Sequence, residues 1–377
     1  MRFAELAGQE TIKEKLVGLV DSNRLSHALL FLGKEGSGAL QLAIALSQYI
    51  VCEKTVSNDS CGTCPACIKA HALSHPDIHF SFPTITRNSG DKPVCSDFIV
   101  EWRSFVAQTP FGNTYDWLQA VGAENKQGNI TAHECEDIIR KLQLKSFESG
   151  YKVLIQWMPE YLGQSGNKLL KLIEEPPPKT VFIFVAEDES RILPTILSRT
   201  QLIKINPLET ASLEQWLIKH QAVPREKARS IAPMAHGNMR EAFQILHHAD
   251  EDWQELLRQW LNAILKNGPA AQLKWVEEMA KLGREKQKQF LNYFIHLLSS
   301  SIRILHTGTT PSATEVEIDF ANRLTKLAST EQVSAMVDEL GSSIYHIERN
   351  ANPKILFMAL TIKISHILRD KSLILTN

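Results

Sequence analysis

The stretch FLGKEGSGAL, residues 31–40, decides the fold expected for this chain. It links an apolar, strand-like run, SHALLFL (26–32), to an apolar, helix-like run, ALQLAIALSQYIV (39–51). A glycine-rich turn between a strand and a helix is the layout of a phosphate-binding loop, because backbone N–H groups at a helix start can bind phosphate. Gly33 and Gly38 stand at the two glycine positions of the pattern G-x-x-x-x-G-K-[ST].

The loop lacks the two side chains that carry its chemistry. Ala39 stands where the pattern has Lys, and Leu40 stands where it has Ser or Thr. The missing Lys would bind the β- and γ-phosphates, and the missing hydroxyl would hold Mg²⁺. Each lost charge-assisted contact removes about 1.5–3 kcal/mol of binding. The loop therefore predicts a degenerate nucleotide site, formed by Gly33, Gly36 and Gly38, that does not hydrolyse ATP. Whether it binds ATP stays open. A plain strand-to-helix turn without any nucleotide site is the alternative.

A second part of the hydrolytic apparatus is also missing. In nucleotide hydrolases of this layout, a later buried strand ends in an acidic pair that holds Mg²⁺. The corresponding run, YKVLIQW (151–157), ends in Gln156 and Trp157 and is followed by Met158. Glu160 comes two residues later, and we expect it to be a solvated carboxylate at a helix start. Both absences together indicate a loss of hydrolysis.

The remaining sequence predicts an α/β region followed by helices. Strand-like runs at 180–187 and 201–205 alternate with helical stretches, including an amphipathic one over 130–150, which is typical of a parallel sheet covered on both faces. After Pro207 the periodicity is helical, with turns near Gly268, Pro311 and Pro353. The expected domains are an α/β domain, a three-helix domain and a larger helical domain, over 1–206, 207–250 and 253–377.

Four cysteines form the spacing C-x₈-C-x₂-C-x₂-C: Cys52, Cys61, Cys64 and Cys67. Four thiolates on a short loop suit a tetrahedral, structural Zn²⁺ site without an open position. A reduced cluster without metal is the alternative. Cys95 and Cys135 stand apart and are expected to be core or surface thiols.

Composition excludes several classes of function. The net charge of the 377 residues is −1 and the pI is about 6.9, so no global basic field attracts nucleic acid. Charges interrupt every apolar run before 18 residues, and the start has no basic leader with an apolar core. We therefore expect a cytoplasmic protein without a membrane span.

Five segments in this order resemble the bacterial DNA polymerase III clamp-loader family of the AAA+ superfamily. They are RLSHALLFLGKEGSG (24–38), the cysteine run, NKLLKLIEEPPPKTVFIFVAE (167–187), LPTILSRT (193–200) and GNMREAF (237–243). The resemblance reaches about residue 250. It implies an AAA+ sheet domain with a zinc module at 52–67, a helical lid and a collar domain that oligomerises.

The resemblance implies roles for two arginines. The segment Ser198-Arg199-Thr200 is similar to the family's SRC segment, with Thr in place of Cys. In the family this Arg reaches ATP bound in the adjacent subunit as an arginine finger, which implies the same role for Arg199. The residues alone also allow an Arg that caps a helix or pairs with a surface acid. Arg240 of GNMREAF is similar to the second sensor, which faces nucleotide in its own subunit, or it is a structural leftover.

The replaced loop residues resemble the delta-prime-like branch of the family, which lacks a working loop. This implies a non-hydrolysing subunit that joins gamma/tau and delta subunits and acts on the sliding clamp and primed DNA through the assembled complex. An active gamma/tau-like ATPase that uses an unusual lysine such as Lys34, or a zinc-bearing interaction protein outside replication, remains open. So does the role of the insertion at about 85–128, whose Trp102, Phe105 and Trp117 fit packing or docking.

Overall fold

The structure, a computed structural model, describes residues 1–88, 90–123, 126–247, 253–307, 315–349 and 351–369. The chain divides into two compact units, and each is described by itself. The first comprises Met1–Val223 and Ala235–Glu241, and the second comprises Pro224–Met234 and Ala242–Asn377.

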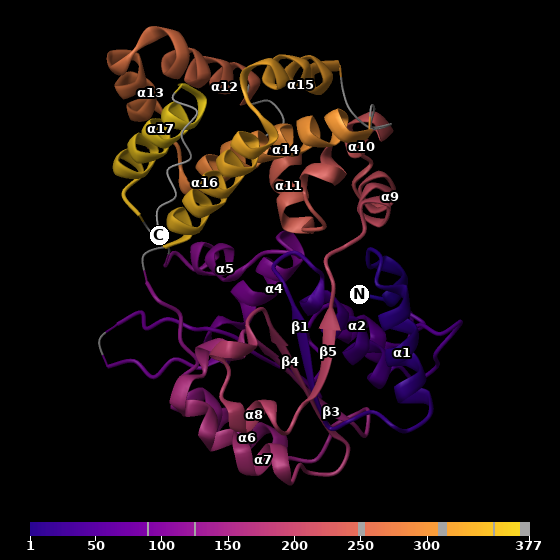
Figure 1. Ribbon diagram of the computed structural model, residues 1–377. Coiled ribbons are helices and arrows are strands. Elements are labelled where there is room, and N and C mark those ends of the chain that lie inside the picture. The colour runs from indigo at the N-terminus through magenta and orange to yellow at the C-terminus, as the bar shows by residue number, and fades with distance from the viewer. Residues whose placement is uncertain (89, 124–125, 248–252, 308–314, 350, 370–377) are drawn as a thin grey trace. The chain divides into compact units, whose positions relative to one another are not determined.

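The first unit is built on a five-stranded sheet in which all neighbouring strands are parallel. The strands, in their order across the sheet, are β2 (Ile78–Ser81), β3 (Lys152–Trp157), β4 (Thr180–Ala186), β1 (Ala28–Gly33) and β5 (Gln201–Ile205) (Figure 1). The predicted parallel α/β sheet is confirmed.

Strand β1 lies inside the sheet, and this position sets the place of the loop. Leu30 is in register with Phe184 of β4 on one side and with Leu202 of β5 on the other. The loop after β1 therefore leaves the sheet at its carboxyl edge, where β3 and β4 also end. That edge is where ligands of parallel α/β sheets bind.

Side chains of the strands alternate between two apolar layers, as the two-residue period of a strand requires. Phe31, Ile155 and Ile183 belong to one layer, whereas Leu154 and Phe182 belong to the other. Every residue of β3 and β4 is buried, since helices cover both faces of a parallel sheet.

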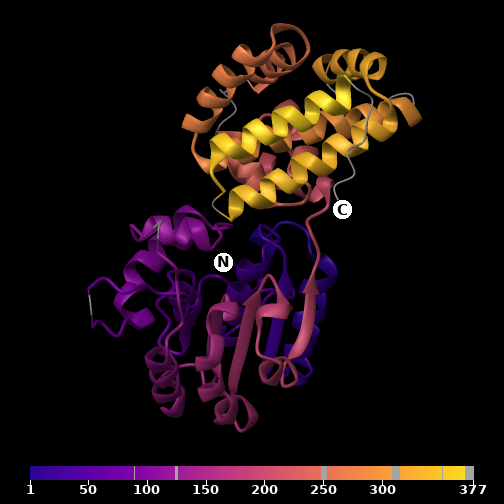
Figure 2. The ribbon, with the colours of Figure 1, turned by 60° about the vertical axis from the view of Figure 1, so that its left-hand side comes forward.

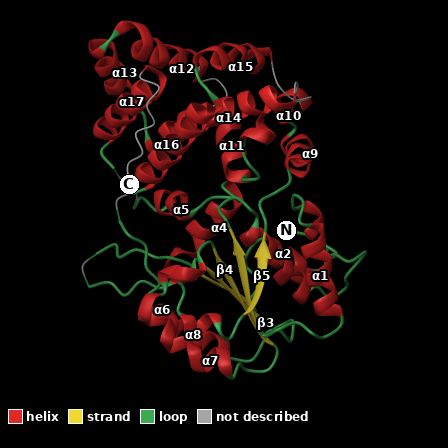
Figure 3. Cartoon of the chain, viewed as in Figure 1, coloured by secondary structure: helices red, strands yellow, loops and turns green. Residues whose placement is uncertain are grey.

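The first layer is covered by helices from the amino-terminal half. These helices are α1 (Glu10–Asp21), α2 (Ala39–Val51), α3 (Pro65–His71), α4 (Ile99–Gln108) and α5 (Thr114–Ala120). Figure 3 shows α1 and α2 beside the sheet, and Figure 2 shows the indigo amino-terminal segments there from another side. Helix α2 begins directly after the glycine-rich loop, and all but one of its residues are buried. The loop is therefore fixed between two buried elements.

The second layer is covered by α6 (Ala132–Gln143), the 3₁₀ helix η4 (Gly163–Leu169), α7 (Leu170–Glu174) and α8 (Pro194–Leu197). The Thr131 hydroxyl caps α6 by accepting the Glu134 N–H at 3.2 Å. This helix is shorter than the one predicted over 130–150. The buried Asp77 carboxylate accepts the N–H groups of residues 147–149, which holds that stretch as a loop rather than a helix.

The insertion at about 85–128 packs into the first layer. Trp102 and Trp117 are fully buried, with ring centroids 5.4 Å apart in an edge-on arrangement. Trp102 also stacks on Phe82 at 4.2 Å, and Phe105 is 3% exposed. These aromatic residues therefore belong to the core and do not form a docking face.

Helix α9 (Thr210–Gln221) also belongs to the first unit, and the second unit is helical over its described residues. Its core includes Trp260 stacked on Trp275 at 4.7 Å. Of the predicted turns, Gly268 directly precedes a helix and Pro353 is the first residue of another. Pro311 lies outside the described residues. The helices are α10 (Arg225–Met234), α11 (Met239–His247, which starts in the first unit), α12 (Trp253–Asn262), the π-helix η6 (Ala263–Asn267), α13 (Pro269–Lys281), α14 (Arg284–Thr307), α15 (Glu315–Leu327), α16 (Thr330–Glu348) and α17 (Pro353–Arg369).

Candidate functional site

The glycine-rich loop joins β1 to α2 as predicted, and its glycines are required by geometry. Gly38 precedes the first residue of α2 with φ +86°, a left-handed conformation that favours glycine. A Cβ on Gly36 would lie 1.7 Å from Asn238 Oδ1, and a Cβ on Gly33 would lie 2.5 Å from Ser37 Oγ. The loop is therefore packed tightly against its own protein.

The space left at the loop is about 30 Å³, which is room for little more than a water molecule. Ligand pockets are usually at least about 300 Å³. Ala39, Leu40, Phe111, Trp157 and Met158 are among the residues that enclose this space. The loop pocket is filled by protein in this conformation.

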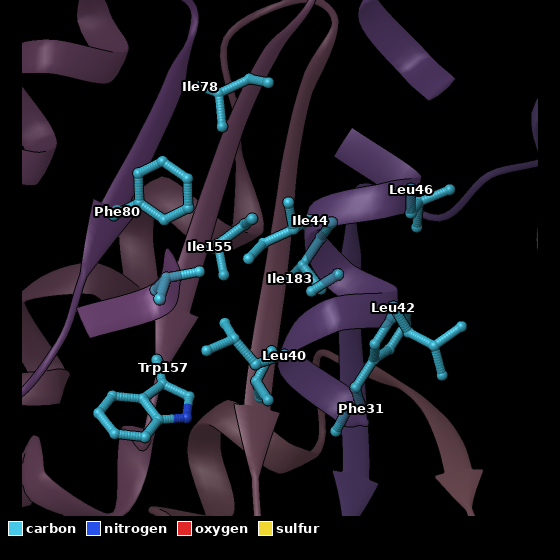
Figure 4. Close-up of a cluster of buried hydrophobic side chains, with 14 of the residues drawn as sticks. Phe31, Leu40, Leu42, Ile44, Leu46, Ile78, Phe80, Ile155, Trp157 and Ile183 are labelled. Carbon is cyan, nitrogen blue, oxygen red and sulfur yellow. The ribbon is translucent and has the colours of Figure 1, made fainter. Parts of the chain in front are cut away.

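Trp157 and Met158 fill the place at the end of β3 where hydrolases carry acids. Trp157 is 4% exposed and belongs to the same buried cluster as Leu40 of α2 (Figure 4). Its ring centroid lies 5.2 Å from that of Trp102 in the insertion. Met158 is 5% exposed, and its N–H donates to the Val185 carbonyl at 2.8 Å. Neither side chain offers a carboxylate for Mg²⁺.

Glu160 is buried, so the prediction of a solvated carboxylate is wrong. It is 7% exposed, and its Oε1 accepts the N–H groups of Glu187 and Asp188 at 2.7 and 2.9 Å. The 3₁₀ helix η3 (Pro159–Tyr161) returns the chain to the end of β4, and the carboxylate joins the two strand ends there. Burial raises the pKa of Glu160.

The environment of the loop pocket disfavours negative charge. Glu187 lines it together with Lys34 and Glu35. Burial, with repulsion from Glu35 and Glu160, raises the pKa of Glu187 to about 8. A phosphate group would meet the same desolvation and the same repulsion, which opposes its binding.

Arg240 is bound by carboxylates of the protein. Its side chain is 3% exposed. Its Nε and Nη2 donate to the two carboxylate oxygens of Asp116 at 2.6 and 2.7 Å, and Nη1 donates to Glu35 Oε1 at 3.1 Å. The structure places Arg240 beside the loop and pairs it with Asp116 of the insertion.

Arg199 lies at the surface after α8, with its side chain 34% exposed. Its Nε donates to Glu174 Oε1 at 2.6 Å, and its Nη1 donates to the Thr195 carbonyl at 2.7 Å. Arg199 thus pairs with a surface acid, which was one of the two readings of its role. Its position remains accessible to a neighbouring molecule.

The four cysteines of the predicted cluster come together, with their Sγ atoms all within 4.8 Å of one another. A tetrahedral ion with metal–sulfur bonds of about 2.3 Å separates its sulfurs by about 3.8 Å. Cys61 Sγ and Cys67 Sγ are 3.8 Å apart, which is the separation of two sulfurs in such a site. These residues could hold one metal ion.

Backbone donors around the sulfurs favour thiolates. The N–H groups of Cys64 and Cys61 lie 3.3 Å from the sulfurs of Cys61 and Cys52, respectively. Donation from Thr63 and Cys64 lowers the pKa of Cys61 to about 6, while burial raises the pKa of Cys67. Cys95 and Cys135 lie outside the cluster and are buried core thiols.

Sequence reasoning missed Asp116 and Phe111. Asp116 lies 124 positions from Arg240, and no local pattern links the two. Asn113 and Asp116 form an N-x-x-D pattern in which each side chain accepts the other's backbone N–H at 3.0 Å. This pattern could have located the start of α5, but it does not reveal that Asp116 pairs with Arg240.

The sheet and the glycine-rich loop define an α/β protein whose loop has Ala39 and Leu40 where the phosphate-binding pattern has a lysine and a hydroxyl. The chain belongs to the family described as DNA polymerase III, delta subunit, whose profile matches residues 8–209, more than half of the sequence.

Curated relatives include subunits of DNA polymerase III. The chain is 27% identical to subunit delta' of Bacillus subtilis over 63% of its own length and 59% of the relative. It is 23% identical to subunit delta' of Escherichia coli over 94% of both chains. A gamma/tau subunit of Mycobacterium tuberculosis is 27% identical over 52% of this chain and 27% of the relative.

Solved structures that match the chain include a gamma subunit-related protein of DNA polymerase III from Thermotoga maritima. It covers 94% of this chain and 99% of its own, with 17% identity and a TM-score of 0.41. The clamp loader delta protein of Bacillus subtilis gives a TM-score of 0.33 at 10% identity, over 94% of this chain and 99% of its own. Among the described residues, no helix is long and apolar enough to span a membrane.

Proposed function

We propose that this chain is a delta-prime-like subunit of the bacterial DNA polymerase III clamp loader, with an AAA+ α/β domain. It assembles with gamma/tau and delta subunits and helps to load the sliding clamp at primed DNA in the cytoplasm. We propose an α/β domain over 1–206, a lid over 207–250 and an oligomerising collar over 253–377. Family membership and the delta' and gamma/tau relatives support this assignment.

The proposal that the chain does not hydrolyse ATP is carried by one observation, the filled loop pocket of about 30 Å³. Ala39 and Leu40 enclose it where a lysine and a hydroxyl would act, and Trp157 and Met158 replace the acidic pair. Phosphoryl transfer depends on positioning and on charge compensation by Lys and Mg²⁺. A pocket without either group gives no route to the transition state.

We further propose that Arg199 serves the ATP site of the adjacent subunit as an arginine finger. An exposed guanidinium held by a hydrogen bond to Glu174 and another to Thr195 is partly preorganised for a second anion. Such a group contributes about 10³–10⁵ to the rate in systems that use it. The loop glycines and Arg240 then serve as architecture rather than as a nucleotide site.

The metal of the four-cysteine cluster is proposed to be zinc. Four sulfurs within 4.8 Å of one another, one pair of them 3.8 Å apart, suit Zn²⁺, and a complete thiolate shell leaves no position for substrate. Cys52, Cys61, Cys64 and Cys67 would hold the ion, which would stabilise a segment too short for its own core.

The two other readings are less well supported. An active ATPase would need a substitute for the loop lysine, yet Lys34 is exposed and stands at the start of the loop, whereas the pattern has its lysine at the end. A zinc-bearing interaction protein outside replication does not explain membership of a polymerase subunit family.

Purified chain incubated with Mg²⁺ and ATP tests the proposal. We expect no turnover above a no-protein control and no saturable binding of a fluorescent ATP analogue. A hydrolysing gamma/tau subunit, assayed in parallel, shows that the assay works. Turnover that copurifies with this chain through successive columns would contradict the proposal.

A further inference from the structure

The Arg240 guanidinium is the most completely enclosed cation at the loop. Three of its N–H donors bind carboxylate oxygens, two on Asp116 and one on Glu35, and its side chain is 3% exposed. A buried cation is tolerated only when it is paired and hydrogen-bonded. The two acids come from distant parts of the chain, because Asp116 is in α5 of the insertion and Glu35 is in the glycine-rich loop.

The segment that carries Arg240, Ala235–Glu241, is packed directly onto the loop. The Met239 N–H donates to the Gly36 carbonyl at 3.0 Å, and a side chain on Gly36 would collide with Asn238. The Leu208 N–H donates to the Gly237 carbonyl at 2.9 Å. The segment is thus attached to the loop through a backbone hydrogen bond as well as through Arg240.

The start of α5 fixes both acids in place. Asp116 accepts the Asn113 N–H at 3.0 Å, and Asn113 Nδ2 donates to Glu35 Oε2 at 2.8 Å. The guanidinium of Arg240 then meets a preset pair of carboxylates, one of which binds it through two parallel hydrogen bonds. Bidentate, charge-assisted pairs of this kind are the strong ones.

We infer that Asp116 and Glu35 form a built-in counter-anion for Arg240, which latches the segment Ala235–Glu241 onto the glycine-rich loop without a nucleotide. Asp116 is the principal member of this latch. The inference rests on the proposed absence of nucleotide and gives that absence a structural cause: the cation at the loop already has its anions. A phosphate entering the loop would have to displace two carboxylates that also repel it.

Hydrogen exchange at the Met239 amide in the full chain tests the latch. Asp116→Asn keeps the shape of the side chain and an oxygen for the helix cap but removes the charge. Asp97→Asn is the matched control, because Asp97 accepts the Val94 N–H at 3.0 Å in the same manner at an exposed site. We expect exchange at Met239 to accelerate at least about tenfold in Asp116→Asn and to stay within about twofold in the control.

A double-mutant cycle separates the latch from a purely local cap. In an Arg240→Gln background, Asp116→Asn should have little further effect on Met239, because the pair is already broken. Equal effects in both backgrounds, or exchange no faster than in Asp97→Asn, would overturn the inference. If the Asp116→Asn protein loses its helical circular dichroism, the Glu35→Gln variant is used instead. We expect exchange at Met239 to be about threefold faster in Glu35→Gln, and unchanged exchange would overturn the inference.

These outcomes are distinct from those of the proposed function. ATP binding by the wild-type chain would refute the nucleotide-free role without altering exchange at Met239 in the ligand-free protein. Unchanged exchange in the variants would remove the latch even if the wild-type chain bound no ATP.

Discussion

Glu174 Oε1 accepts a hydrogen bond from Arg199 Nε at 2.6 Å and so fixes the direction of the guanidinium at the surface of the first unit. Glu174 ends α7, and Arg199 follows α8, so the contact joins the two segments that carry the resemblance motifs LLKLIEEPP and SRT. The acid both orients the arginine and competes for it. This relationship makes Glu174 a positioning residue for the proposed finger.

Glu174→Gln should weaken the finger without abolishing it. The amide still accepts a hydrogen bond from Arg199 but holds it less firmly, because the charge is lost. We expect the ATPase rate of the reconstituted clamp loader to fall by about two- to tenfold, with the KM for ATP nearly unchanged. Glu175→Gln, at the exposed neighbouring position, is the control and should leave the rate within about twofold of wild type. A matching loss in both variants would argue against positioning through Glu174.

Glu187→Gln should stabilise the protein at alkaline pH. The folded pKa of Glu187 is about 8, because of burial and repulsion from Glu35 and Glu160, whereas the ordinary value is 4.5. Between these values unfolding releases a proton, so the wild-type chain loses stability as pH rises from about 4.5 to about 8. The gain from Gln should be small near pH 5 and reach about 1–3 kcal/mol near pH 8.5, measured by urea denaturation.

The control for this pH dependence is Glu189→Gln at an exposed position on the same turn. Its difference from wild type should stay nearly constant across the same pH range. A Glu187→Gln difference that is equally flat would mean that this carboxylate is ionised at neutral pH, and the pocket would then tolerate negative charge.

Cys64→Ser should remove the metal and destabilise the segment around residues 52–67. Loss of one of four thiolates breaks a structural tetrahedral site, whose binding energy is part of the folding energy. We expect wild-type protein to contain about one zinc per chain by atomic emission, and the variant to contain much less and to melt at a lower temperature. Cys135→Ala, a buried thiol outside the cluster, should destabilise by packing loss but retain the metal. Equal metal content in wild type and Cys64→Ser would refute the site.

Local patterns in the sequence predicted much of this structure. Strands β1, β3, β4 and β5, the glycine-rich loop and the four-cysteine cluster follow from short spacings and lie where they were expected. The absence of the loop lysine and hydroxyl at Ala39 and Leu40 can also be read from the local sequence, since the loop pattern assigns a function to each position.

Contacts between distant segments were beyond such patterns. Glu160 was expected in solvent because its burial depends on how the chain returns to β4. The pairing of Asp116 with Arg240 spans 124 positions, and the closing of the pocket by Phe111 depends on how the insertion packs. Such contacts follow from tertiary packing, which one sequence does not encode in any fixed spacing.

The most direct measurement of the central claim is the steady-state ATPase rate of a clamp loader reconstituted from gamma/tau, delta and this chain, stimulated by clamp and primed DNA. Arg199→Ala is compared with wild type and with Arg191→Ala, a nearby arginine whose guanidinium lies 5.5 Å from the ring centroid of Tyr161. We predict that Arg199→Ala assembles normally and lowers the rate at least about tenfold, because one ATP site loses its compensating charge, whereas Arg191→Ala does not. An Arg199→Ala complex that assembles and hydrolyses ATP at the wild-type rate would contradict the account.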